Sequence, residues 1–400
     1  MPSDTRKKQQ GADSGIAVRV ATSIGAFTRD EWDGLAGAAR GEGYNPFVSY
    51  EFLSALEESG CAVRKSGWQG QHLRLEDGNG RLLGAVPCYL KSHSQGEYVF
   101  DHGWADAFER AGGQYYPKLQ AAIPFTPAPG PRLLPRADDP SMRRLLAAGL
   151  KAVTDQLDVS SAHVTFAQDD DIEALAEAGF LVRHDQQFHF FNEGFSSYDD
   201  FLATLASRKR KALKKERREA LAPGISIEWL TGKDLTEDAW DAFFAFYMDT
   251  GSRKWGRPYL NRLFFSLVGE RMADDILLVM AKRDGRYIAG ALNFIGHDRL
   301  YGRNWGCIED HPFLHFEVCY HRAIDFAIAR GLKVVEAGAQ GEHKLARGYR
   351  PVTTRSAHYI PNPGFRHAVD DYLKRERREV AKMSEYLSEH TPFRKNEEEQ

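Results

Sequence analysis

The sequence predicts an α/β fold of the α+β kind, in which two domains each carry a mixed, mostly antiparallel central sheet. Strand and helix patterns alternate along the 400 residues, a length that favours two domains over one core. The order of these elements repeats in the second half of the chain. Two hairpins also match in detail, since "DGNGRLLGAV" at 77–86 resembles "DGRYIAGAL" at 284–292, and such repetition indicates duplicated domains.

The first half opens with a strand pattern at 15–23, followed by helix patterns at 28–38 and 45–60. Alternating apolar residues at 72–90, interrupted by "DGNG", predict a hairpin. The remaining predicted elements are a strand at 97–105, a proline-rich stretch at 115–135, a helix at 141–157, a strand at 161–167, a helix at 171–180 and a strand at 182–191.

The second half follows the same order. It has a strand at 224–232, helices at 236–251 and 258–272, a strand, hairpin and strand within 275–306, a helix at 315–331, and strands at 332–338 and 354–361. The predicted organisation is a disordered lead at 1–15, a first domain at 16–192, a second domain at 193–366, and a C-terminal amphipathic helix with an acidic tail at 367–400.

The composition is that of a water-soluble globular chain, with 42% hydrophobic and 27% charged residues. No apolar run reaches the roughly 20 residues of a membrane helix, and the polar N-terminus lacks the apolar core of a signal peptide. The four cysteines are widely spaced and form neither a metal pattern nor a disulfide framework. We therefore expect a cytoplasmic protein with reduced thiols and no metal site.

A dense polar loop follows the predicted strand at 332–338. Ligands of open α/β sheets bind beyond the carboxyl ends of strands, so "EAGAQGEHKLARGYRPV" at 336–352 is predicted to line a cleft. Glu336 is the candidate general base, His343 the candidate proton shuttle, and Lys344 or Arg347 would neutralise a phosphate or an oxyanion. Gln340 is a candidate substrate contact. The alternatives are a structural salt bridge for Glu336 and a surface loop with self-satisfying charges.

Two neighbouring segments supply further candidate substrate-binding residues. Arg303 and Trp305 are expected on the strand that faces the cleft, and His315 and Glu317 near the start of the following helix. A carboxylate is favoured at that helix end. The alternative for Trp305 is a place in the core.

The segment 316–358, "FEVCYHRAIDFAIARGLKVVEAGAQGEHKLARGYRPVTTRSAH", resembles the signature of the FemAB-like family of predicted N-acyltransferases, named for peptidoglycan biosynthesis or recognition. The segment "YNPFVSYEFLSALEESG" at 44–60 and the "GWA" region at 103–105 resemble the same family. The resemblance extends over residues 17–366 and implies two GNAT-like domains in tandem.

The resemblance implies transfer of an acyl group to an amine of a peptidoglycan precursor or a related envelope metabolite. Aminoacyl-tRNA is the expected donor, and no tightly bound cofactor is expected. Acyl-CoA is the alternative donor, although "WGCIEDHPFLHFEV" at 305–318 lacks the glycine-rich loop that cradles its pyrophosphate in GNAT enzymes. A non-catalytic module that recognises peptidoglycan precursors or nucleic acid is a third hypothesis. A lipid-linked acceptor would bring the protein to the membrane surface without a transmembrane segment.

By analogy with acceptor-binding residues of the FemAB group, Asp101, His102 and Trp104 are candidates for a second pocket. FemAB-group proteins also have a basic segment at the start of the second domain, which corresponds here to "SRKRKALKKERREAL" at 207–221. The candidate RNA or phosphate contacts in it are Arg208, Lys209, Arg210, Lys211 and Lys214. The alternative is a solvated helix stabilised by pairs with its own glutamates.

Overall fold

The computed structural model describes residues 15–37, 41–254, 258–338 and 341–394. Apart from Gly15, the predicted disordered lead lies outside these ranges, as does the end of the acidic tail at 395–400.

The first half contains nine strands and five α-helices within the described ranges. The strands are β1 (Ala17–Ala21), β2 (Trp68–Gly70), β3 (His72–Glu76), β4 (Leu82–Val86), β5 (Cys88–Lys91), β6 (Lys118–Ala121), β7 (Leu134–Pro135), β8 (Ala162–Val164) and β9 (Leu181–Phe191). The helices are α1 (Arg29–Ala36), α2 (Tyr50–Glu58), α3 (His102–Arg110), α4 (Pro140–Gln156) and α5 (Asp169–Glu177).

The second half repeats the strand, two helices and antiparallel strands that open the first. Its strands are β10 (Ser226–Leu230), β11 (Ile276–Arg283), β12 (Arg286–Ile295), β13 (Arg299–Cys307), β14 (Val334–Glu336) and β15 (Arg350–Tyr359). Its helices are α6 (Tyr198–Thr204), α7 (Ser207–Leu221), α8 (Glu237–Lys254), α9 (Arg262–Arg271), α10 (Leu314–Phe316), α11 (Arg322–Arg330) and α12 (Pro363–Glu389). The predicted mixed α/β class with mostly antiparallel sheets is confirmed.

Local sequence explains where several helices begin. Thr28 and Glu31 form a reciprocal capping box at the start of α1. Asn362 accepts a hydrogen bond from the backbone of α12, and Pro363 occupies the first position of that helix, where its missing N–H is not needed.

One predicted strand is wrong. Residues 97–105 form a loop and the start of α3, and β6, inside the proline-rich stretch, takes the expected place in the sheet between β5 and β8. The apolar residues at 98–100 resembled a strand. However, Glu97 and Asp101 turn inward to form ion pairs with Lys118, which a regular strand at this position could not provide.

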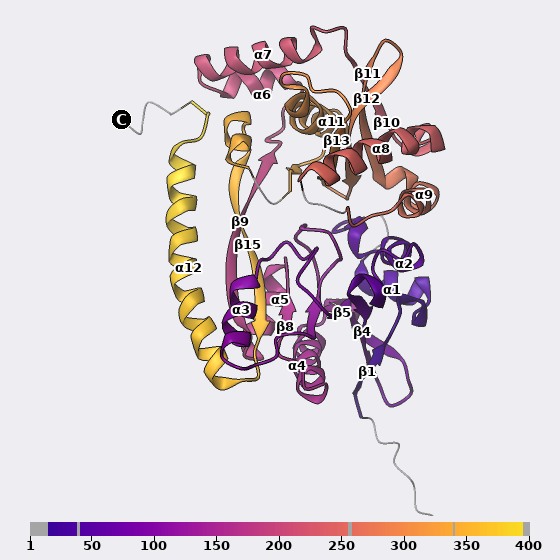
Figure 1. Cartoon of the computed structure of the whole chain (residues 1–400), viewed down its shortest axis with the longest axis vertical. Coiled ribbons are helices and arrows are strands. Elements are labelled where there is room, and N and C mark those ends of the chain that lie inside the picture. Colours follow the sequence, from indigo (N-terminus) through magenta and orange to yellow (C-terminus); the bar gives the residue numbers. More distant parts are fainter. Residues whose placement is uncertain (1–14, 38–40, 255–257, 339–340, 395–400) are drawn as a thin grey trace, which may run out of the picture.

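The two halves share one large sheet. A sheet of 11 strands runs in the order β10-β11-β12-β13-β14-β9-β15-β8-β6-β5-β2, and a second sheet contains β1, β3, β4 and β7. β9 from the first half pairs with β14 and β15, and β15 from the second half also pairs with β8. In Figure 1 these two long strands run side by side from the lower lobe to the upper lobe. The domain boundary at 192/193 stays a prediction.

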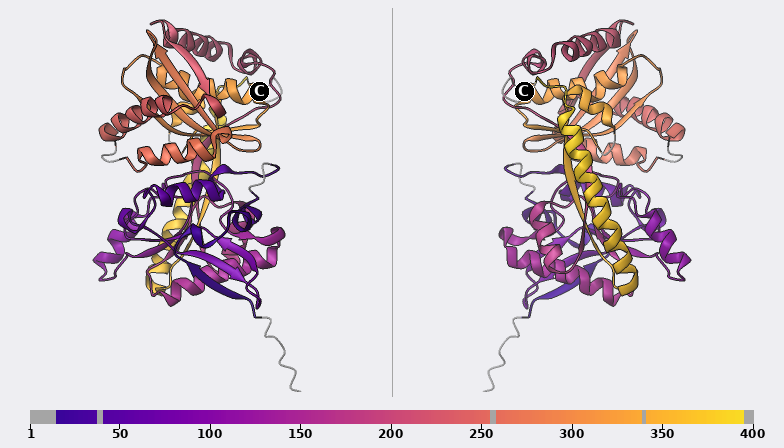
Figure 2. Two further views of the ribbon diagram at one scale, coloured as in Figure 1. Left: turned by 90° about the vertical axis from the view of Figure 1, so that its right-hand side faces the viewer. Right: turned by 90° about the vertical axis from the view of Figure 1, so that its left-hand side faces the viewer.

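Helix α12 and a shared core fix the lobes to each other. α12 lies along β9 and β15, as the side views of Figure 2 show, and buries Val369 and Leu373 against Trp104. On the other side of the molecule, α2 packs on α9, with the rings of Phe52 and Phe264 5.7 Å apart. Because both contacts are apolar and buried, they hold the strand ends around the candidate site in one arrangement.

Candidate functional site

Glu336 is the last residue of β14 and lies at the centre of the large sheet. It stands opposite Tyr301 of β13 on one side and opposite His189 of β9 on the other. Its side chain is 3% exposed. Oε1 accepts a hydrogen bond from Arg299 at 3.0 Å, whereas Oε2 has no hydrogen-bond partner among the described residues. Three neighbouring strands thus hold a carboxylate with one bonded and one free oxygen.

The electrostatics of this group suit proton transfer near neutral pH. Burial raises the pKa of Glu336 from 4.5 to about 7, and Arg299 opposes the rise. Burial also lowers the pKa of His189 to about 3, so its ring is neutral. The Nε2 atom of His189 lies 4.0 Å from Glu336 Oε2 and 3.3 Å from Gln187 Oε1. The carboxyl group therefore faces a neutral neighbour and can exchange a proton at pH 7.

Glu336 lines a pocket of about 350 Å³ between the two lobes. The first half contributes residues 42–45, the Pro129–Gly130–Pro131 turn and Gln168, and the second half contributes residues 297–299, Tyr301 and Lys333. Tyr44 closes one side, because its hydroxyl donates to Asp275 at 2.8 Å and its carbonyl accepts from the backbone of His297. The volume matches a small ligand or one arm of a larger ligand.

The strands diverge just beyond Glu336. β13 and β14 are paired only over Arg299–Tyr301 and Val334–Glu336, and β13 then continues to Cys307. A Cβ atom at Gly302 would lie 3.3 Å from the carbonyl oxygen of Glu336, so a larger residue would push the strands apart at this point. The divergence opens the end of β14 to the loop that follows.

Lys344 projects into this opening from the loop. It is 1% exposed, and its Nζ donates to the carbonyl of Gly338 at 2.9 Å. Burial lowers the pKa of Lys344 to about 8, and the Cys319 thiol opposes the change. No ion pair joins Lys344 to a carboxylate among the described side chains. A buried cation of this kind is available to a negative charge on a ligand.

His343 lies on the other side of the loop. Its Nε2 is 2.9 Å from the Tyr320 hydroxyl, and its ring packs 6.2 Å from that of His315. Trp305 packs 5.1 Å from the same His315 ring. The structure thus brings His343, His315 and Trp305 together, but on the sheet face opposite Tyr301 and away from the Glu336 pocket.

A β-bulge explains why Arg303 and Trp305 do not share a face. Leu292 and Asn293 of β12 stand opposite Asn304 and Gly302, which leaves Arg303 as an extra residue. The bulge reverses the alternation of side chains beyond it. Arg303 points toward the first half and donates to the carbonyl of Phe125, while Trp305 packs on the opposite core.

Arg347 and Glu317 lie in ion-pair networks with α7. Arg347 donates two hydrogen bonds to Glu216, at 2.9 and 2.7 Å. Glu317 is fully buried and accepts from Arg217 and Arg322. Both side chains are saturated by these contacts, which favours the structural alternative for them. They also attach α7 to the loop that carries Lys344.

The basic residues of α7 divide between this inner face and solvent. The residues exposed among the candidates are Arg208, Lys209, Lys211 and Lys214, and Arg210 is half-buried. Lys214 pairs with Asp199 at 2.8 Å. The outward face therefore presents a positively charged surface, as the sequence predicted from its composition.

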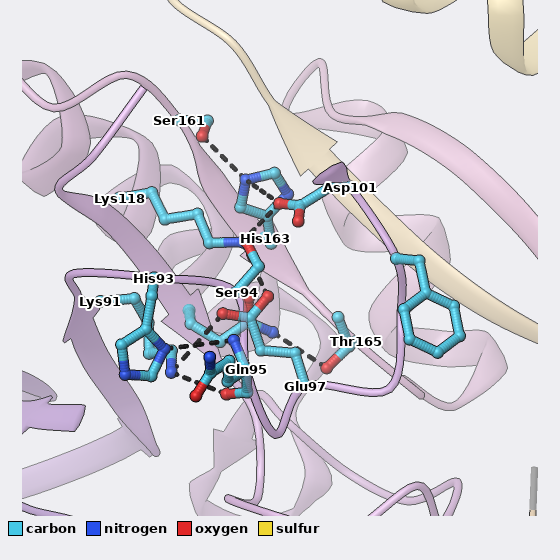
Figure 3. Close-up of polar contacts among 12 residues, drawn as sticks. Lys91, His93, Ser94, Gln95, Glu97, Asp101, Lys118, Ser161, His163 and Thr165 are labelled. Atoms are coloured by element: carbon cyan, nitrogen blue, oxygen red, sulfur yellow. Dashed lines mark hydrogen bonds and ion pairs between the residues drawn. The ribbon is translucent and has the colours of Figure 1, made fainter. Parts of the chain in front are cut away.

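Of the first-half candidates, Asp101 and Trp104 are buried and His102 is exposed. Figure 3 shows Asp101, at the end of the loop at 92–101, beside Lys118 and His163. Burial by itself raises the pKa of Asp101, but the adjacent Lys118 ammonium holds it below its ordinary value. These residues do not line the Glu336 pocket.

Three remaining predictions concern Gln340, a metal site and a membrane helix. Gln340 lies outside the described residues. Among the residues that are described, no group of three or more His, Cys, Asp or Glu side chains is placed to hold a metal ion. None of the helices in the described ranges combines the length and apolarity needed to cross a membrane.

Arg299, His189 and Tyr301 surround Glu336 but are not among the residues predicted from the sequence. Arg299 comes 37 residues before Glu336, and only the pairing of distant strands brings them together. The one local signal is the position of Arg299 at the start of an apolar strand pattern, where a charged residue is common.

Comparisons with known proteins agree with this fold. The sequence model of the FemAB-like family, described as peptidoglycan biosynthesis/recognition, matches residues 23–395. No curated protein sequence matches the chain at a significant level. The crystal structure of FemX is 11% identical with a TM-score of 0.54, over 86% of this chain and 98% of FemX.

Two further solved structures are similar. A conserved protein of unknown function from Bacteroides thetaiotaomicron VPI-5482 is 11% identical with a TM-score of 0.50, over 86% of this chain and 99% of that one. A tandem GNAT protein from the clavulanic acid biosynthesis pathway is 12% identical with a TM-score of 0.44, over 87% and 99%. At these identities the likeness concerns the fold alone. The family match covers nearly the whole chain, and the protein therefore belongs to the FemAB-like family.

Proposed function

We propose that the protein is an N-acyltransferase that uses Glu336 as the general base for an amine acceptor. The observation that carries this proposal is the free Oε2 of a buried carboxylate, whose pKa of about 7 lets it gain and lose a proton at neutral pH. This oxygen belongs to a residue that lines the pocket between the lobes. The family and the fold agree with acyl transfer and do not name the substrates.

The proposed reaction is direct aminolysis. The acceptor nitrogen attacks the carbonyl carbon of the acyl donor, a C–N bond forms, and Glu336 removes the proton that the nitrogen loses. The C–O bond of an ester, or the C–S bond of a thioester, then breaks, and the leaving group takes up a proton. We assign to Lys344, whose Nζ donates to the carbonyl of Gly338 just beyond Glu336, the role of stabilising the negative charge of the tetrahedral intermediate.

Aminoacyl-tRNA is the donor that we propose, with acyl-CoA as the alternative. The exposed basic side chains of α7 support a polyanionic donor. Arg347 donates to the carboxylate of Glu216 and to the carbonyl of His343, and these bonds hold the helix next to the loop that carries Lys344. We propose an amine of a peptidoglycan precursor or a similar envelope metabolite as the acceptor.

A donor assay tests the proposal. The purified protein is incubated with charged tRNA or with acetyl-CoA, in the presence of small amines from a cell extract, and loss of the acyl group from each donor is measured. Amine-dependent loss of the acyl group from charged tRNA supports the proposal. If only acetyl-CoA loses its acyl group, the donor is acyl-CoA instead. If neither donor is discharged, the proposed activity is wrong.

Replacing Arg299 by glutamine is expected to move the pH dependence of kcat/KM to higher pH. The guanidinium lowers the pKa of Glu336 against the effect of burial, so its loss should shift the acidic limb upward by about one pH unit or more. The measurement is kcat/KM from pH 5.5 to 9. Arg283→Gln, which removes an arginine of β11 that pairs with Glu309, is the control and should leave the profile unchanged.

Removing Arg208, Lys209 and Lys211 together, by substitution with glutamine, is expected to weaken tRNA binding and reduce its salt dependence. Each lost phosphate contact should lower the slope of log K against log salt by about 0.7–0.9. Filter binding at several salt concentrations measures the slope. As a control, an Arg64→Gln, Lys65→Gln variant removes two basic side chains from an exposed turn of the first half. Equal slopes for both variants would contradict an RNA-binding role for α7.

A further inference from the structure

One face of the sheet in the first half is lined by polar side chains. Tyr89, Gln120, His163 and His358 stand directly opposite one another on β5, β6, β8 and β15. Residues that are paired across strands project to the same face, so these four form a row. Two residues along, Lys91 and Lys118 stand opposite each other and begin a second row. The other face of these strands is apolar and packs on α4 and α5.

The loop at 92–101 and helix α3 cover the polar face. Lys118 donates to Ser94 at 2.8 Å and to Glu97 at 2.7 Å, and it also bonds Asp101. Lys91 lies 3.5 Å from the centre of the Trp68 ring. Figure 3 shows Lys91 and Lys118 beside Ser94, Glu97 and Asp101 of this loop. Sheet faces buried in a protein are normally apolar, so this arrangement requires a reason.

Unsatisfied polar atoms are concentrated at this face. Of nine buried side-chain atoms without a hydrogen-bond partner among the described residues, six belong to residues of this face or its cover. They are Trp68 Nε1, Tyr89 Oη, Glu97 Oε1, Asp101 Oδ1, Gln120 Oε1 and His358 Nε2. A buried polar atom without a partner costs about 1–3 kcal/mol. Six such atoms along one face, from β2 to β15, indicate that the face binds something besides protein.

The donor and acceptor pattern defines what would bind. Glu97 and Asp101 each bond Lys118 through one oxygen. The other oxygen of Glu97 lies 3.7 Å from Lys91 Nζ without a hydrogen bond, and the other oxygen of Asp101 has no hydrogen-bond partner among the described residues. With Gln120 Oε1, these oxygens are three acceptors that receive no hydrogen bond, and they favour a ligand rich in N–H or O–H groups.

The net charge of the cluster further restricts the class of ligand that could bind. Two lysines face two carboxylates, so the cluster is balanced and gives no net attraction to an anion or to a cation. The His163 and His358 Nδ1 atoms are 2.6 Å apart and share one proton, and burial lowers the pKa of both rings, so the pair is neutral. Trp68 and Trp104 supply apolar surface beside the polar atoms.

We propose that this face is a second ligand site, closed by the loop at 92–101, and that its ligand is an uncharged, hydroxyl-rich molecule of the saccharide class. The site is separate from the Glu336 pocket, and the inference does not depend on the proposed acyl transfer. Entry requires the loop to lift. Gly96 and Tyr98 within it have φ angles of +79° and +60°, so the loop has the tight turns of a compact cover rather than a strand.

A matched series of sugars tests the ligand class. Glucose, glucosamine and glucuronate share one ring and differ in charge, and each is added to the full chain. Glucose is expected to raise the melting temperature by about 1–2 °C at ten times its Kd and to slow amide exchange at 92–101. The charged analogues should bind at least five-fold more weakly.

Two substitutions on the polar face test where glucose binds. Gln120→Leu and Tyr89→Phe each remove an unpartnered polar atom while keeping similar shape, and should weaken glucose binding at least five-fold. Tyr349→Phe removes a buried, unpartnered hydroxyl in the second half and is the matched control, with unchanged binding. The proposal fails if no sugar slows amide exchange at 92–101, or if all three sugars bind equally well. It also fails if Gln120→Leu and Tyr89→Phe only gain stability, since the face would then hold ordered water only.

Discussion

Replacing Glu336 by glutamine is expected to lower kcat by about 10²–10⁴-fold and at the same time to stabilise the protein. The loss of activity follows from removal of the general base. The gain in stability follows from burial. The unfolded chain ionises this carboxyl above pH 4.5, whereas the folded protein retains its proton until about pH 7. Folding stability therefore falls between these two values, and glutamine removes that loss.

Stability at pH 8 should accordingly rise by up to about 2 kcal/mol, since one pH unit corresponds to about 1.4 kcal/mol and Arg299 loses its partner. Urea unfolding at pH 5 and pH 8 measures the effect, which should be small at pH 5. Glu193→Gln, an exposed carboxylate that pairs with Arg350, is the control and should change neither quantity appreciably. A Glu336 variant that is less stable at pH 8 would indicate a structural salt bridge instead of a base.

Replacing Lys118 by methionine is expected to destabilise the protein by about 3–5 kcal/mol. The side chain is fully buried and is the shared partner of Glu97 and Asp101. Its removal leaves two carboxylates facing each other in the interior, which is the costly way to break a buried ion pair. Chemical unfolding at pH 7.5 gives the magnitude.

A further variant distinguishes unpaired charge from a packing defect as the cause of the lost stability. Combining Lys118→Met with Glu97→Gln and Asp101→Asn removes the unpaired charges, and most of the stability should return. Lys65→Met, an exposed substitution, should change stability by less than about 0.5 kcal/mol. If the triple variant is as unstable as the single variant, the charges of the cluster contribute little and shape dominates.

Local sequence patterns predicted the element types well where one period dominates. The hairpin around Asp284 and Gly285 and the strand before Glu336 are examples, because alternation and turn residues are properties of neighbouring positions. The strand expected at 97–105 failed because the partner of Asp101 is Lys118, which is distant enough that no local pattern can reveal it.

The same limit applies to the candidate site. Glu336 could be selected from the loop that it begins, but Arg299 and His189 reach it only through the pairing of β13 and β9 with β14. The face occupied by Trp305 depends on a single extra residue in β13. Arg217 and Glu216 appeared to belong to a solvated basic helix, and the structure places them in inward ion pairs instead. Sequence can supply the chemistry of a site, and strand pairing decides which side chains meet.

The exchange of β9 and β15 between the lobes has a consequence for synthesis of the chain. β15 lies between β8 and β9. The sheet of the N-terminal lobe therefore lacks one strand until residues 350–359 have left the ribosome. A fragment that ends near the middle of the chain would expose unpaired sheet edges and would be prone to aggregate. Neither lobe should be obtainable as an independent folded piece, and maturation of both should occur in a single late event.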